Sequence, residues 1–170
     1  MVADRTYHAL TMSKLVAVAA GALVLCTGAA SLTAVAATQA SDRERTASLR
    51  EQALAAGRQI AVDFAAYDYR HLDADFKRVA SESTGTFKKQ FSSSFSGLQD
   101  LFTKAQAVST AEVASAGVVD AGPHQATVVI AIDRTITNTS VPDGQKDSLA
   151  VQLTLLHVGD RWLASELKPL

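Results

Sequence analysis

The stretch QATVVIAIDRTITNT, residues 125–139, decides the fold class of this chain. Four of its aliphatic residues, Val128, Ile130, Ile132 and Ile136, occupy even positions. A period of two is typical of a β-strand that turns one face toward a core and the other toward solvent. The pattern therefore predicts one long strand over the whole stretch, with an apolar inner face.

Further strands are predicted on both sides of this one, at Val113–Asp120, Ser148–Val158 and Arg161–Leu167. The segments between the four strands are short and rich in turn formers: Gly122-Pro123-His124, Val141-Pro142-Asp143-Gly144 and Gly159-Asp160. Proline fixes φ and glycine accepts a positive φ, so we expect tight turns in these segments. Consecutive strands joined by tight turns predict an antiparallel sheet.

The residues before the strands have helical periodicity, and helices are predicted over Asp42–Tyr69, Asp73–Ala80 and Thr86–Gln106. Ser41 and Glu44 form a capping box, and Asp73 is expected to be the N-cap of the second helix. The third helix carries an apolar stripe that is more typical of a core than of a ligand cage: Phe87, Phe91, Phe95, Leu98 and Phe102. We expect this stripe to cover one face of the sheet. Helices followed by an antiparallel sheet predict an α+β domain.

The N-terminal part of the chain has the composition of a membrane span. No charged residue occurs from Leu15 to Ser41, and Leu15–Ala37 alone contains 23 residues. As a helix these would extend roughly 34 Å, enough to cross a hydrocarbon core of about 30 Å. We therefore predict a short cytoplasmic N-terminus at 1–14, a transmembrane helix at 15–37, and a stalk helix with an extracytoplasmic domain at 38–170. Small residues for packing against another membrane helix lie at Ala17, Gly21 and Gly28.

A cleavable signal peptide is the alternative to a permanent span. Arg5 and Lys14 would form its basic region and Ala34-Val35-Ala36 its cleavage site, although the apolar run exceeds the usual length of about 7–15 residues. The small-residue stripe has an alternative too, because an alanine-rich span without any partner helix would show the same residues. Charge alone does not fix the orientation, since basic residues flank both sides of the span.

The composition excludes several functional classes. The formal net charge is −1, from 16 basic and 17 acidic residues, so there is no basic surplus for nucleic-acid binding. The single cysteine, Cys26, rules out an internal disulfide and a cysteine-ligated metal site. No HExxH, GxSxG or phosphate-loop motif occurs. We therefore expect no metal, no cofactor and no catalytic residue.

A family resemblance is carried by the order of several stretches along about 130 residues. These stretches are Ala65–Asp75, Ser83–Phe87, Ala116–Val119, Ile132–Asn138 and Asp160–Leu163. In them the chain resembles actinobacterial membrane proteins associated with the mammalian-cell-entry (Mce) lipid transport systems. The resemblance implies a cone of the nuclear-transport-factor-2-like or cystatin-like type, with three helices and a curved four-stranded antiparallel sheet.

The same resemblance implies a location and a role. The domain would lie outside the cytoplasmic membrane, with the N-terminus inside, and its partners would be the lipid bilayer and subunits of an Mce-type complex. The protein would stabilise, assemble or couple this multi-subunit importer of fatty acids or sterols. The inner-membrane scaffold of type IV secretion has a similar layout, so a general assembly role stays open. Two further alternatives are a carrier that holds a lipid ligand in the cone and an enzyme of the ketosteroid-isomerase type.

The polar residues considered for the cone are Tyr67, Tyr69, His71, Asp73, Asp75, Asp133 and His157. An isomerase would need an aspartate base beside a hydrogen-bond donor in an apolar cavity, and we favour structural roles over catalysis for these residues. Asp133 and Arg134 point to opposite faces of their strand, and we expect Asp133 to face the interior of the cone.

Trp162 is expected to plug the core, with its indole N–H bonded to a carbonyl, while a role at an interface is the lesser alternative. A core filled by Trp162 together with Phe87, Phe91 and Phe95 would exclude a lipid carrier, because no pocket would remain.

Overall fold

The computed structural model describes residue 41 and residues 43–170, and the chain divides into two compact units, Met1–Arg45 and Thr46–Leu170. The described residues of the first unit are helical. The predicted span at 15–37, its small-residue stripe and the cytoplasmic N-terminus lie outside the described residues. Among the residues that are described, no helix is both long enough and apolar enough to cross a membrane.

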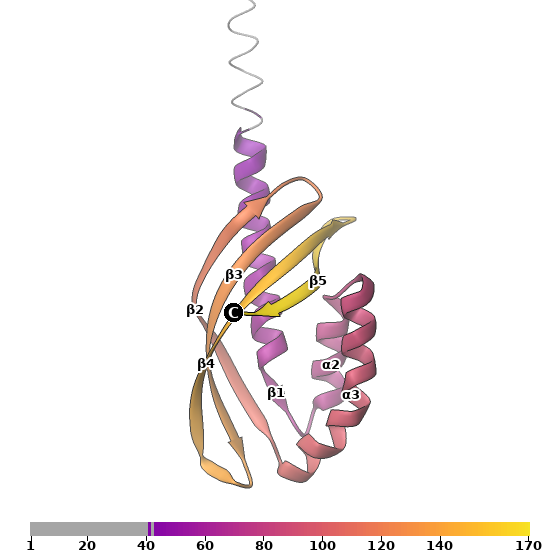
Figure 1. Ribbon diagram of the computed structural model, residues 1–170, viewed down its shortest axis with the longest axis vertical. Helices are drawn as coiled ribbons and strands as arrows, with labels where there is room; N and C mark the ends of the chain where they lie inside the picture. The colour runs from indigo at the N-terminus through magenta and orange to yellow at the C-terminus, as the bar shows by residue number, and fades with distance from the viewer. Residues whose placement is uncertain (1–40, 42) are drawn as a thin grey trace, which may run out of the picture. The chain divides into compact units, whose positions relative to one another are not determined.

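The second unit is built from helices and an antiparallel sheet (Figure 1). In chain order its elements are helix 46–65, β1 (Tyr67–Asp68), α2 (Leu72–Ser81), α3 (Gly85–Ala105), β2 (Val108–Ala121), β3 (Gln125–Asn138), β4 (Val141–Val158) and β5 (Arg161–Pro169). The strands lie in the order β1-β2-β3-β4-β5, and each neighbouring pair is antiparallel. The prediction of an α+β domain with a curved antiparallel sheet is thus confirmed.

The first helix of this unit ends at residue 65, where the sequence predicted Tyr69. The chain becomes extended at Tyr67 and Asp68, which pair with Ser109 and Val108 at the start of β2. The Asp75 carboxylate stabilises this conformation, because its Oδ2 accepts a hydrogen bond from the Asp68 backbone N–H at 3.0 Å. The sheet consequently has five strands instead of the predicted four, and β2 begins at Val108 instead of Val113.

Two local predictions are wrong. The N-cap of α2 is His71, and Asp73 lies inside the first turn. The negative charge of Asp73 there still interacts favourably with the helix dipole. The β3–β4 turn is at residues 139–140, because the Asn138 side chain accepts hydrogen bonds from the backbone N–H groups of Ser140 and Val141 at 2.8 and 3.1 Å. The segment predicted as that turn, 141–144, belongs to β4 and lies where the β3–β4 register shifts.

The main core lies between helix 46–65 and the sheet. Its buried residues come from the helix, from the even positions of β3, from the odd positions of β4 and from the start of β5: Ala53, Ile60, Ala61, Ala65, Ala126, Val128, Ile130, Ile132, Val151, Leu153, Leu155, Trp162 and Ala164. The expectation that the phenylalanine helix covers the sheet is therefore wrong, because helix 46–65 occupies most of that face. Of the phenylalanine stripe, Phe87 packs against this core.

Small residues allow helix 46–65 to approach the sheet so closely. Gly57 is buried, and a Cβ at this position would lie 2.6 Å from Val128 Cγ2 and 3.4 Å from Ile130 Cδ1. Both neighbours are β-branched and fully buried, so neither can move away at low cost. Position 57 therefore requires glycine, because the Cβ of any other residue would clash with Val128.

We expect Gly57→Ala to lower the free energy of unfolding by about 1 kcal/mol, because an overpacking cost of about 1–3 kcal/mol exceeds the gain in helix propensity of about 1 kcal/mol. The matched control is Gly97→Ala in α3, where no atom lies within 4 Å of the added Cβ and the same propensity gain should raise stability. Urea unfolding followed by Trp162 fluorescence measures both. Equal stabilisation by the two substitutions would contradict the close approach.

Candidate functional site

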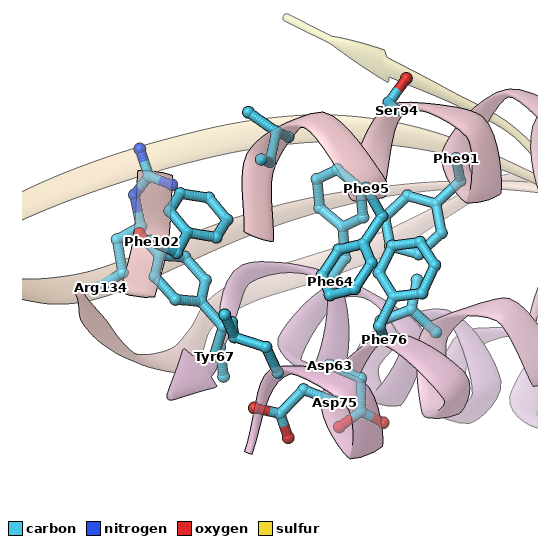
Figure 2. A pocket seen from close by; sticks show the side chains of 14 residues that line it. Asp63, Phe64, Tyr67, Asp75, Phe76, Phe91, Ser94, Phe95, Phe102 and Arg134 are labelled. Carbon is cyan, nitrogen blue, oxygen red and sulfur yellow. The ribbon is translucent and has the colours of Figure 1, made fainter. Parts of the chain in front are cut away.

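A pocket of about 280 Å³ opens where α2, α3 and β1 meet the end of helix 46–65 (Figure 2). We call it the aromatic pocket, because five phenylalanines and a tyrosine contribute to its wall. Its lining residues are Asp63, Phe64, Ala66, Tyr67, Leu72, Asp75, Phe76, Val79, Phe91, Ser94, Phe95, Leu98, Phe102 and Arg134. The third helix thus directs most of its phenylalanine stripe at this pocket.

The aromatic rings form two groups with space between them. Tyr67 stacks on Phe102, with ring centroids 4.7 Å apart, at one end of the pocket beside Arg134. At the other end the ring of Phe76 stacks on Phe91 and Phe95, with centroid distances of 4.4 and 3.5 Å (Figure 2). The rings from α3 are only half-buried. The core is therefore not filled by these phenylalanines, and the condition that would exclude a lipid carrier is not met.

The polar groups near Tyr67 are held by their neighbours. Burial raises the pKa of the Tyr67 hydroxyl, and the positive charge of Arg134 opposes part of that shift. Arg134 Nε donates a hydrogen bond to Asp147 Oδ2 at 3.0 Å, across the β3–β4 ladder. This bond lowers the pKa of Asp147. The guanidinium is thus fixed at the rim of the pocket by a cross-strand ion pair.

The opposite side of the pocket holds a cluster of acidic and basic side chains around Asp63. Asp63 is only 8% exposed, and its carboxylate accepts from Arg78 Nε at 2.8 Å and from Gln59 Nε2 at 2.7 Å. Arg78 also pairs with Asp75 at 2.8 Å. Burying a carboxylate destabilises the folded state unless the charge is paired. The ion pair with Arg78 offsets this cost for Asp63.

Glu82, which follows α2, belongs to the same cluster. Burial raises the pKa of Glu82 to about 7, and the charge of Asp63 and a hydrogen bond to its side chain add to the effect, while Arg78 and Arg161 partly oppose it. A carboxyl group that is partly buried beside a second acid is protonated more easily than a free one. In the described part of the chain, no group of three or more His, Cys, Asp and Glu residues is placed to hold a metal ion.

Of the polar residues considered from the sequence, the structure brings Tyr67 and Asp75 together at the aromatic pocket, and the others lie elsewhere. Tyr67 lines the aromatic pocket, but Tyr69 lies outside it, with the Arg70 guanidinium 5.8 Å from its ring centroid. Asp73 is exposed on α2, where it accepts a hydrogen bond from Gln99 Nε2 at 3.1 Å.

The expectation that Asp133 faces the interior of the cone is wrong. Asp133 is exposed on the outer face of β3, where it accepts a hydrogen bond from Ser148 Oγ at 2.7 Å. The neighbouring Ile132 is buried, and it is Arg134 that lines the pocket. Alternation along the strand placed the two side chains on opposite faces, but the choice between the faces was reversed.

Trp162 lies in the core with 6% of its surface exposed, and its ring stacks on His157 at 4.6 Å. Its indole N–H was expected to meet a carbonyl, and this is wrong, because no acceptor lies within reach among the described residues.

Sequence reasoning missed Asp63, Glu82 and Gln59. Asp63 did give a signal, since it follows Ile60 by three residues and therefore lies on the apolar face of its helix. A charged residue on such a face requires a partner from elsewhere in the fold. Glu82 gave no signal, because its position is set by where α2 ends and by the contact with helix 46–65.

We expect Arg78→Leu to lower the free energy of unfolding by about 2 kcal/mol, because it leaves the buried Asp63 without its counter-charge. The control is Arg70→Leu, which removes an exposed ion pair with Asp68 and should change stability little. Urea unfolding at pH 7 compares the two variants with the wild type. A loss no larger for Arg78→Leu than for Arg70→Leu would contradict the role given to Arg78.

Solved structures with the same arrangement of elements include an IcmL-like type IV secretion system protein from Legionella pneumophila. Its TM-score is 0.61 at 16% identity, and the match covers 71% of this chain and 91% of that one. A periplasmic fragment of TraM has a TM-score of 0.54 at 14% identity, with coverage of 70% and 95%. VirB8 from Agrobacterium tumefaciens has a TM-score of 0.52 at 12% identity, with coverage of 68% and 88%. At these identities the likeness shows a shared fold.

No curated protein matches the chain significantly. The family model described as "Uncharacterized protein Rv1363c/MT1408-like" matches residues 12–161, which is most of the chain and includes all the elements that form the aromatic pocket. The chain therefore belongs to the Rv1363c/MT1408-like family.

Proposed function

We propose that this protein is a non-enzymatic accessory subunit of an Mce-type lipid transporter. A single span at Leu15–Ala37 would anchor it in the cytoplasmic membrane, with the folded domain outside. There it stabilises, assembles or couples the subunits of a complex that imports fatty acids or sterols.

The observation that carries this proposal is an exposed apolar surface beside the aromatic pocket. Leu98 and Leu101 lie three residues apart on α3 and are 42% and 60% exposed. Leu98 also lines the pocket, so the two leucines and the half-buried rings form one surface. A single exposed leucine needs no explanation, but apolar side chains gathered at the mouth of an open pocket are typical of protein interaction sites.

The acids around the pocket also suit a binding role better than catalysis. Asp63 and Asp75 are both paired with Arg78. The pair with Asp63 joins helix 46–65 to α2, and the pair with Asp75 lies within α2. Of the three aspartates considered from the sequence, Asp73 and Asp133 lie on the surface away from the aromatic rings, and Asp75 is paired with Arg78. The isomerase alternative therefore has no observation in its favour.

Support for the location comes from the sequence and from the structural neighbours. The uncharged stretch at 15–37 is long enough to span a bilayer. One neighbour in the comparison is a periplasmic fragment of TraM, and another is an IcmL-like type IV secretion system protein. Those statements concern the neighbours, and for this chain they support the proposal through the fold alone.

The test is affinity purification of the tagged full-length chain from native membranes in mild detergent. We expect Mce-type transporter subunits to co-purify in constant ratio, and we expect Leu98→Asp combined with Leu101→Asp to reduce their yield several-fold. The matched control is Val119→Asp on β2, because Val119 is equally exposed, at 63%, but distant in sequence and on another element.

Absence of transporter subunits from the wild-type preparation would contradict the proposed partner. An unchanged yield with the α3 variant would contradict the proposed surface. Protease treatment of intact cells and of spheroplasts checks the orientation, since a domain that stays protected in spheroplasts cannot lie outside the membrane.

A second candidate function, a lipid-binding carrier, is favoured by the space between the two groups of rings. The volume of about 280 Å³ lies at the lower limit of known ligand pockets, which are about 300–1,000 Å³. A pocket of this size suits part of an acyl chain better than a sterol.

We expect the full-length chain in detergent to bind radiolabelled palmitate saturably, and Leu98→Trp to abolish binding by filling the space between the rings. Val119→Trp is the control of equal bulk outside the pocket. Binding that is unsaturable, or that survives Leu98→Trp, would dismiss the carrier function while leaving the accessory role in place.

A further inference from the structure

The two ends of the aromatic pocket differ in their polar groups. Arg134 lies at one end, beside the stacked rings of Tyr67 and Phe102 (Figure 2). The opposite side carries the carboxylates of Asp63 and Asp75. Hydrogen-bond donors and acceptors are therefore separated by a space whose walls are mainly aromatic. An amphiphilic ligand with a negative head group is attracted to the Arg134 end and repelled by the acidic side.

The sheet holds Tyr67 and Arg134 on the same face. Tyr67 on β1 pairs with Ser109 of β2, and Arg134 on β3 pairs with Ala111 of β2. Residues two apart on a strand point to the same face, as do residues directly opposite each other on neighbouring strands. Ala111 has a small side chain, which leaves room beside the guanidinium. Backbone pairing thus positions both side chains at the end of the pocket.

Arg134 has donors that the protein itself does not use. Its Nε and Nη2 both donate to a single atom, Asp147 Oδ2. A guanidinium carries five N–H groups in a planar fork, so three of them have no acceptor in the described part of the chain. The side chain is 26% exposed, and these groups are therefore accessible to a ligand. An arginine paired through one edge can bind a second carboxylate through another.

The Tyr67 hydroxyl supplies a further donor at the same end. No hydrogen bond of this hydroxyl joins it to another described residue. Burial raises the pKa of Tyr67, so the hydroxyl stays protonated at neutral pH and can donate. A carboxylate placed beside the guanidinium would accept hydrogen bonds from both residues.

The apolar part of the pocket follows α3 away from Arg134. Phe102 lies at the Arg134 end, and Phe91 and Phe95 stack with Phe76 at the other end. Phe102 follows Phe91 by 11 residues, which corresponds to roughly 16 Å along the helix axis. This length is comparable with the extended hydrocarbon chain of dodecanoate.

We propose that Arg134 and Tyr67 form a head-group site for a single-chain carboxylic acid, whose hydrocarbon chain lies between the rings of α2 and α3. The inference rests on the second candidate function, the lipid carrier, and adds to it the head group and the direction of binding. One guanidinium shared with Asp147 and one hydroxyl suit a single negative charge better than the nearly double charge of a phosphate. A sterol or a fatty alcohol lacks the charge that Arg134 recognises.

The test compares two probes of equal chain length, radiolabelled dodecanoate and 1-dodecanol, on the full-length chain in non-ionic detergent at pH 8. We expect dodecanoate to bind several-fold more tightly than the alcohol. We expect Arg134→Gln to weaken dodecanoate binding about tenfold, because it removes charge-assisted hydrogen bonds. The same variant should leave 1-dodecanol binding unchanged, which also shows that the pocket has folded.

Two further variants separate the head-group site from general effects on the fold. Tyr67→Phe keeps the ring that stacks on Phe102 and removes only the hydroxyl, so we expect a loss of a few-fold for dodecanoate alone. The matched control is Arg70→Gln, because Arg70 also pairs with an aspartate, Asp68, but lies outside the aromatic pocket. It should change the affinity for neither probe.

The direction of binding is tested on the wild type with two photoreactive dodecanoates. A diazirine beside the carboxylate should label Tyr67 and Phe102, and a diazirine at the far end of the chain should label Phe76, Phe91 or Phe95. Labelled residues are located by mass spectrometry of tryptic peptides. The reverse pattern, or the same pattern with both reagents, would overturn the proposal.

The binding data distinguish this proposal from the functions on which it builds. Equal affinities of the wild type for the two probes, or undiminished dodecanoate binding by Arg134→Gln, would overturn the head-group site and leave the carrier function in place. Failure of both probes to bind the wild type would overturn both. Because no partner protein takes part, none of these results depends on the co-purification experiment.

Discussion

The close approach of helix 46–65 to the concave face of the sheet is the constraint on which the rest of the structure depends. Gly57 and the buried alanines Ala53, Ala61 and Ala65 let the helix lie directly on the aliphatic rows of β3 and β4. A helix with larger residues at these positions would stand farther from the sheet and leave voids, which protein interiors rarely tolerate. The centre of the domain is therefore mainly aliphatic and is filled by a single helix.

Because that helix occupies the sheet, the phenylalanines of α3 need other surfaces to cover them. These surfaces are on α2, where Phe76 stacks on Phe91 and Phe95, and on the last turns of helix 46–65, where the ring of Phe64 packs at a tilt against Phe91. The hairpin of α2 and α3 offers less area than a sheet would, so several rings stay half-buried and a pocket remains between them. The pocket thus exists because helix 46–65, and not α3, covers the sheet.

The sequence predicts the parts of the fold that depend on periodicity and fails where tertiary contacts decide. The strand around Ile130 and Ile132 and the helix around Phe91 and Phe95 were predictable, because each buries one face. The short strand β1 was not, since it exists through pairing with β2 and a bond to Asp75. Most residues of the candidate site could not be predicted from the sequence either, because tertiary contacts bring them together. A lone acid such as Asp63 shows that a partner is needed, but only the fold shows that the partners are Arg78 and Gln59.

The departures from ordinary packing are grouped around the α2–α3 hairpin. In the described part of the chain, the buried side-chain atoms without a hydrogen-bond partner are Glu82 Oε2, Trp162 Nε1 and Ser109 Oγ, and Ser109 pairs with Tyr67 of the pocket. Two of the exposed leucines, Leu98 and Leu101, belong to the same hairpin. Natural sequences retain such locally unfavourable features mainly where function requires them. The filled centre then supports the sheet, while the hairpin and its pocket hold the features on which the proposed function rests.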